Sequence, residues 1–159
     1  MAKAGRTDAM KRLQSAARMS RTALAARLLE HGFYPGQDQI MMALQEKDGL
    51  TPGQLATRLG VRPPTVTKTI NRLQTQGFLT KRSSEDDGRQ AHVWLSDAGR
   101  DAMRAIQKAV AKTDKQGMRG LDKKEQKVLT KLLARIEDNL SAVAAEASPA
   151  DAHEPSDED

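Results

Sequence analysis

The segment Leu50-Thr-Pro-Gly-Gln-Leu-Ala-Thr-Arg-Leu-Gly-Val61 decides the fold of this 159-residue chain. Thr51 and Gln54 have the spacing of a capping box, and Pro52 suits the first turn of a helix because its φ angle is already fixed. Gly60 is typical of the left-handed residue that stops a helix. Three apolar residues have the spacing of an inward helical face: Leu55, Ala56 and Leu59. The segment therefore predicts a short helix that Thr51 opens and Gly60 closes.

A second short helix is predicted to begin near Pro63-Pro64 and to end at Gly77. Three apolar residues fall within about 60° of one another on its wheel, at about 100° per residue, and form its buried side: Val66, Ile70 and Leu73. The opposite side carries hydroxyls, an amide and cations but no acid: Pro64, Thr65, Thr67, Lys68, Asn71, Arg72 and Thr75. Such side chains read base edges and hold phosphates in a major groove. A solvated structural helix usually mixes in Glu or Asp, so the pattern favours a DNA-reading helix.

The sequence period changes after this helix. Alternation predicts two short strands, at 78–82 and 91–95, with a polar loop at 83–90 between them. By the two-residue period, Val93 and Leu95 point toward the helices, and Trp94 points to the outer, partly exposed side. Two short helices followed by a hairpin make a winged helix-turn-helix, here over residues 34–96.

The hairpin tip carries a candidate contact to a DNA minor groove. Arg89 lies just past Asp87-Gly88, and a narrow minor groove concentrates the negative potential that favours an inserted arginine. We expect Asp87 to support Arg89 or another nearby arginine. Arg62 and Arg82 complete the set of cations that we expect at the DNA.

The sequence resembles the MarR family of bacterial regulators over about residues 8–145. The most specific matches are the opening segment and Pro64-Thr-Val-Thr-Lys68. Further matches are Arg72-Leu73, Gly77-Phe78-Leu79, Lys81-Arg82, Asp87-x-Arg89 and Val93-x-Leu95-Ser96-x-x-Gly99. The family usually has an acid where Asn71 stands and a second arginine where Gly88 stands. These departures bear on base preference and on how firmly the wing tip is held, and they leave the expected fold unchanged.

Longer helices are predicted on both sides of the winged module, so the fold class is mostly α with a small β-hairpin wing. The predicted ranges are 8–31, 36–47, Ser96 to about Arg119, and a last helix from the capping box Asp122-x-x-Glu125. The apolar stripes of the flanking regions, 8–33 and 97–145, lack a partner inside one small wing domain. We expect several of their residues to form a dimer interface: Leu13, Leu24, Val128, Leu132, Leu133, Ile136 and Leu140. A self-contained intramolecular bundle is the alternative.

The resemblance implies a triangular homodimer in which the first, fifth and sixth helices of both subunits interlock. Two-fold pairing presents two recognition helices to a pseudo-palindromic operator in double-stranded DNA. The resemblance also implies a small ligand, often aromatic or anionic, between the dimer helices and the DNA-binding lobe. Candidates for its contacts are Arg18, Arg21, Tyr34, Met41 and Met42. The plainer interpretation makes the methionines core and the arginines surface.

Charge is distributed unevenly along the chain. The net charge is +5, but residues 1–136 carry 26 basic and 13 acidic groups, and 137–159 carry eight acids and no Lys or Arg. The stretch 49–82 has six basic residues and no acid, which suggests a polyanionic partner. We expect 146–159 to be a disordered acidic tail.

Composition narrows the function classes. No apolar run approaches the roughly 20 residues of a membrane span, the start lacks a signal peptide, and there is no cysteine, so we expect a cytoplasmic protein that does not interact with a membrane. His31, His92 and His153 are too scattered for a metal site, and we expect no cofactor and no enzyme. The sequence thus predicts a homodimeric DNA-binding transcriptional regulator, a repressor released by a small ligand. The alternative is a winged-helix module for protein–protein interaction without specific DNA binding.

Overall fold

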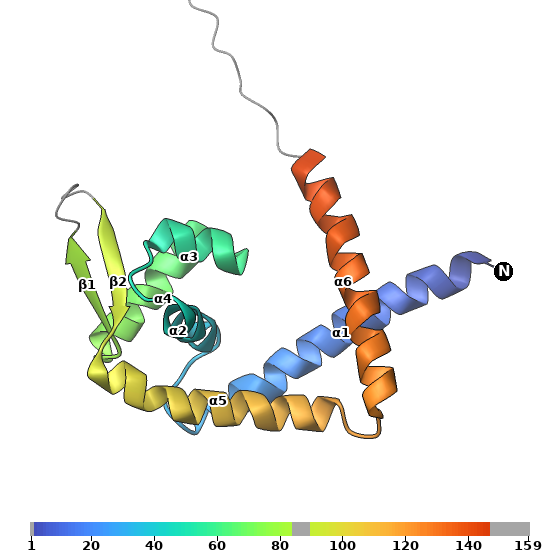
Figure 1. Cartoon of the computed structure of the whole chain (residues 1–159), viewed down its shortest axis with the longest axis horizontal. Coiled ribbons are helices and arrows are strands. Elements are labelled where there is room, and N and C mark those ends of the chain that lie inside the picture. Colours follow the sequence, from blue (N-terminus) through green and yellow to red (C-terminus); the bar gives the residue numbers. More distant parts are fainter. Residues whose placement is uncertain (1, 84–89, 147–159) are drawn as a thin grey trace, which may run out of the picture. The chain divides into compact units, whose positions relative to one another are not determined.

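The structure is a computed structural model that describes residues 2–83 and 90–146 (Figure 1). Its contacts divide the chain into two units, Met1–Gly117 and Met118–Asp159. The first unit contains α1 (Ala2–Leu29), α2 (Gln37–Glu46), α3 (Pro52–Leu59), α4 (Pro63–Thr75), β1 (Leu79–Ser83), β2 (Ala91–Leu95) and α5 (Asp97–Gly117). The second contains α6 (Lys123–Glu146). No helix in the described part of the chain is long and apolar enough to span a membrane.

The core of the first unit gathers around α2. This helix contacts α3, α4, α5 and β2, so apolar residues from all of them bury one another. The side chains predicted to face inward from α4, namely Val66, Ile70 and Leu73, are buried, which confirms the periodicity. Burial of such aliphatic side chains is the main stabilising contribution in a fold with few aromatics.

The predicted capping of α3 is confirmed. Gln54 N–H donates to Thr51 Oγ1, and Thr51 N–H donates back to Gln54 Oε1. Gly60 follows the helix with φ 61°, a left-handed conformation that glycine adopts without a Cβ penalty. α4 then begins at Pro63 as predicted and ends at Thr75, two residues before the predicted stop.

The first helix differs at both ends from its predicted range, 8–31. It begins at Ala2 and ends at Leu29. The chain turns here because the Leu28 carbonyl accepts N–H groups from both His31 and Phe33, while Gly32 takes φ 79°. Leu28 is buried in the core, whereas Leu24 and Leu13 are half-buried.

The two last helices have the predicted starts. Gly99 N–H donates to Ser96 Oγ at the start of α5, which ends at Gly117, two residues before the predicted end. Asp122 and Glu125 form the predicted reciprocal capping box at the start of α6. By itself, α6 displays exposed apolar side chains: Val128, Leu132 and Leu140.

β1 and β2 form the predicted antiparallel hairpin, with β1 shifted by one residue from 78–82. Val93 and Leu95 are buried and Trp94 is half-buried, so the predicted faces of β2 are confirmed. The Trp94 ring covers Gly49, where an added Cβ would lie 2.6 Å from the ring carbon Cζ2. The Arg82 guanidinium carbon lies 5.4 Å from the centre of the same ring.

Candidate nucleic-acid interface

The outward face of α4 is the centre of the candidate interface. The structure places all the predicted DNA-contacting residues of this helix on the exposed side: Pro64, Thr65, Thr67, Lys68, Asn71 and Arg72. The helix carries no acidic residue, so its cations remain available for phosphates. Arg62 stands at the N-cap of α4 and is exposed, and Arg82 is exposed on β1. Asp87 and Arg89 lie outside the described residues.

One edge of this face is joined to the wing by an interaction that the sequence did not predict. Lys81 Nζ on β1 donates to Asn71 Oδ1 at 2.7 Å. A lysine ammonium can only donate, so the amide oxygen must face it and the Asn71 NH₂ group must point the other way. Asn71 is neutral and therefore leaves the positive charge of Lys81 intact.

The other edge is joined to the turn between α1 and α2. The Arg72 guanidinium carbon lies 4.2 Å from the centre of the Tyr34 ring, within the range of a cation–π interaction. Tyr34 is 42% exposed, so the pair lies at the surface. On a wheel at about 100° per residue, Asn71 and Arg72 lie on opposite flanks of the exposed face.

A hydrogen-bonded relay holds the turn that carries Tyr34. The Tyr34 backbone N–H donates to Gln37 Oε1 at 2.9 Å, and Gln37 Nε2 donates to Gln76 Oε1 at 2.7 Å. Gln76 Nε2 donates in turn to the Gly32 carbonyl at 3.1 Å. Gln37 is 1% exposed, and its side-chain NH₂ group finds an acceptor because Gln76 directly follows α4. The relay therefore fixes the turn to the C-terminal end of α4.

The basic stretch 49–82 is partly neutralised from outside. Glu46 at the end of α2 forms an ion pair with Arg58 on α3. This pairing removes Arg58 from the cations that a polyanion would meet. Asp48 similarly pairs with Arg100 on α5 at 2.7 Å and accepts the Leu95 backbone N–H at 3.0 Å, which ties α5 to the wing.

Among the described residues, the structure places the five predicted ligand contacts in different surroundings. Arg21 lines a cavity of about 180 Å³ between α1 and the start of α2. Met41 is fully buried in the core, and Met42 lines a separate surface hollow. Tyr34 stacks on Arg72, and Arg18 is exposed on α1.

The cavity beside Arg21 contains an acid that the sequence analysis did not single out. Asp38 lines it and is 5% exposed, and burial raises the pKa of its carboxyl group. Backbone hydrogen bonds at Asp38, Gln39 and Gly36 oppose that rise. No cluster of three potential metal ligands occurs among residues 2–83 and 90–146.

Comparison with known proteins finds a family match for the central part of the chain. Residues 31–90, which include the turn of Tyr34, both short helices and β1, match the sequence profile of the MarR family. This segment carries a MarR-family domain. An HTH-type transcriptional regulator of Mycobacterium tuberculosis is 36% identical over 69 residues, which cover 43% of this chain and 48% of that protein. The chain thus matches about half the length of this curated relative.

Solved structures show that the MarR fold extends beyond the matched segment. A probable transcriptional regulator from Pseudomonas aeruginosa is 28% identical with a TM-score of 0.72, over 78% of this chain and 92% of that one. A cysteine-to-serine mutant of Escherichia coli MarR, solved with operator DNA, is 18% identical with a TM-score of 0.74, over 79% and 91%. The second likeness establishes the fold alone. Both likenesses cover more of the chain than the segment that matches the family profile.

Proposed function

We propose that this protein is a homodimeric, sequence-specific DNA-binding transcriptional regulator. The observation that carries the proposal is α4, a solvent-facing helix with cations, hydroxyls and an amide outward and no acid. Lys81 beside Asn71 and Arg72 on the opposite flank put positive charge on both edges of the exposed face. The E. coli MarR mutant, which has the same fold, was solved with operator DNA, and this supports a DNA partner here. Such a regulator works in the cytoplasm, where its operator lies.

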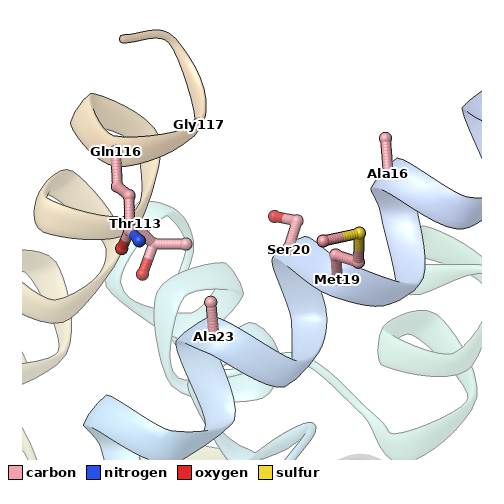
Figure 2. Close-up of a pocket in the computed structure, with 7 residues that line it drawn as sticks. All are labelled: Ala16, Met19, Ser20, Ala23, Thr113, Gln116 and Gly117. Carbon is pink, nitrogen blue, oxygen red and sulfur yellow. The ribbon is translucent and has the colours of Figure 1, made fainter.

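The homodimer is supported by apolar surface that one chain leaves uncovered. A groove of about 360 Å³ lies between α1 and α5. Figure 2 shows the residues that line it from the two helices: Ala16, Met19, Ser20, Ala23, Thr113, Gln116 and Gly117. Arg27 ties the two helices together through hydrogen bonds to Thr113 at 3.2 Å and Gln116 at 2.5 Å. Met19 is 70% exposed beside this groove. Uncovered apolar side chains of this kind mark surfaces that another subunit buries.

The proposal extends to a response to a ligand: the protein represses transcription, and a small molecule relieves the repression. The cavity beside Arg21 is the described site that suits it, because the cavity adjoins the turn that the relay connects to α4. Arg21 offers donors to a polar group of the ligand. The buried Asp38 carboxyl group favours a hydrogen-bond donor over a second anion, because two like charges in one low-dielectric site repel each other.

Selection of genomic fragments by the purified protein, followed by titration, tests the proposed function. The selected duplex and a shuffled duplex of the same composition are titrated between about 50 and 200 mM salt, and we expect the selected duplex to bind at least 10³-fold more tightly. Sedimentation in parallel should give twice 17.4 kDa. Equal affinity for both duplexes would exclude sequence-specific DNA binding and favour the alternative function, a winged-helix module for protein–protein interaction.

A further inference from the structure

We propose that Tyr34 is the positioning residue that presets Arg72 for DNA, so that this contact of the recognition helix depends on the turn between α1 and α2. The inference rests on the proposed DNA-binding function and assigns a role to a residue outside the two short helices α3 and α4. It starts from the 4.2 Å approach of the Arg72 guanidinium to the Tyr34 ring. The two residues are 38 positions apart, so the approach is a product of the tertiary fold.

Stacking on Tyr34 leaves Arg72 competent to bind. A guanidinium is planar, and its N–H groups point outward in that plane, while the stacking uses the flat face. No side-chain hydrogen bond or ion pair from Arg72 is found in the described part of the chain, where its guanidinium lies over the Tyr34 ring. The N–H edge therefore stays available for a phosphate or for the two acceptors of a guanine.

Tyr34 is in turn fixed to the helix that it serves. The relay through Gln37 and Gln76 joins the Tyr34 backbone to the end of α4. Next to it, the rings of Phe33 and Phe78 lie 5.0 Å apart between centroids and pack the same turn onto the start of the wing. The Tyr34 ring consequently stands at a defined place relative to Arg72 before any DNA arrives.

Presetting removes part of the cost of ordering a long side chain on binding. An arginine that is free in solvent samples many rotamers, and it must give them up when it meets DNA. An exposed cation–π contact favours the stacked set of rotamers by a factor of about two to five. We therefore expect Tyr34 to tighten specific binding by that factor, and to do so only through Arg72.

Replacement of Tyr34 by leucine or phenylalanine, combined with Arg72→Ala, tests the inference. Tyr34→Leu keeps the bulk and removes the π face, so the Kd for the selected duplex should rise about two- to fivefold. Tyr34→Phe keeps the ring and should bind like the parent protein. In an Arg72→Ala background, Tyr34→Leu should cause no further loss, whereas a general structural effect would persist there.

The outcomes separate this inference from the function on which it rests. If the parent protein shows no preference for the selected duplex, the proposed function fails. If it shows that preference but Tyr34→Leu matches Tyr34→Phe, or if the loss persists in the Arg72→Ala background, the positioning role is overturned. Thermal unfolding of each variant shows whether the fold is intact, and Tyr34→Gln replaces Tyr34→Leu if the latter unfolds. Loss of the upfield NMR shift of the Arg72 side chain in Tyr34→Leu reports the stacking itself.

Discussion

Replacing Asn71 with aspartate adds one negative charge beside Lys81 at the DNA-facing surface and changes the side-chain volume very little. Asn71 Oδ1 already accepts a hydrogen bond from Lys81 Nζ at 2.7 Å, so a carboxylate in its place would hold the same ammonium as an ion pair. Both side chains are exposed, and such pairs contribute about 0.2–1 kcal/mol to the free energy of unfolding. The variant should therefore fold like the parent protein, with Lys81 neutralised.

The expected loss follows from counterion release. Each phosphate neutralised by a cation contributes about 0.9 to the negative slope of log K against log salt concentration. The contribution of Lys81 to the association constant is therefore about 15-fold at 50 mM salt and about fourfold at 200 mM. We expect Asn71→Asp to lose about these factors and to reduce the slope by about 0.9.

Titration of a fluorescently labelled duplex by anisotropy across the salt series measures both quantities. Asn71→Ala is the matched control, because it removes the amide but leaves the charge of Lys81 free, so its slope should equal that of the parent. Lys81→Ala should reproduce the reduced slope of Asn71→Asp. The reasoning is refuted if Asn71→Asp keeps the full slope, or if Asn71→Ala reduces it equally.

Three further substitutions test the fold and the assembly. Gly49→Ala should lower the free energy of unfolding in urea by about 1–3 kcal/mol, because φ is +72° and the new Cβ meets Trp94 at 2.6 Å. Gly53→Ala is the control and should not lower this free energy, because its Cβ meets nothing closer than 3.9 Å. Burial raises the pKa of Asp38, so the folded state binds its proton more tightly than the unfolded state does. The free energy of unfolding should fall, relative to Asp38→Asn, as pH rises from the ordinary value of 3.8 through the raised pKa; parallel curves would contradict this. Leu132→Glu, at a side chain 49% exposed in one chain, should shift sedimentation from twice 17.4 kDa to 17.4 kDa, and an unchanged mass would place the interface elsewhere.

The parts of the fold that the sequence predicted are those governed by nearby residues. The capping boxes of α3 and α6 join residues three positions apart, so their pattern alone specifies the hydrogen bonds. The inward faces of α4 and β2 follow from periods of 3.6 and 2. The predicted start of β1 was one residue early because Phe78 is an aromatic residue, a type that strands favour, directly before Leu79. In the structure its carbonyl accepts the Ser96 N–H and its ring packs on Phe33.

The pairs that organise the candidate interface lie far apart in the sequence, and periodicity carries no information about them. Tyr34 with Arg72 and Gln37 with Gln76 meet only because the α1–α2 turn returns to the end of α4. The same tertiary arrangement places Met41 in the core, as in the plainer interpretation of the sequence. An amphipathic helix has one free face when it covers a core from one side, but α2 is enclosed by α3, α4, α5 and β2. A helix enclosed on several sides buries even the polar residues of its first turn, and Gln37 is tolerated there because the turn and α4 supply its partners. The relay that follows from this burial is the described route by which a change beside α1 could reach the DNA-facing helix.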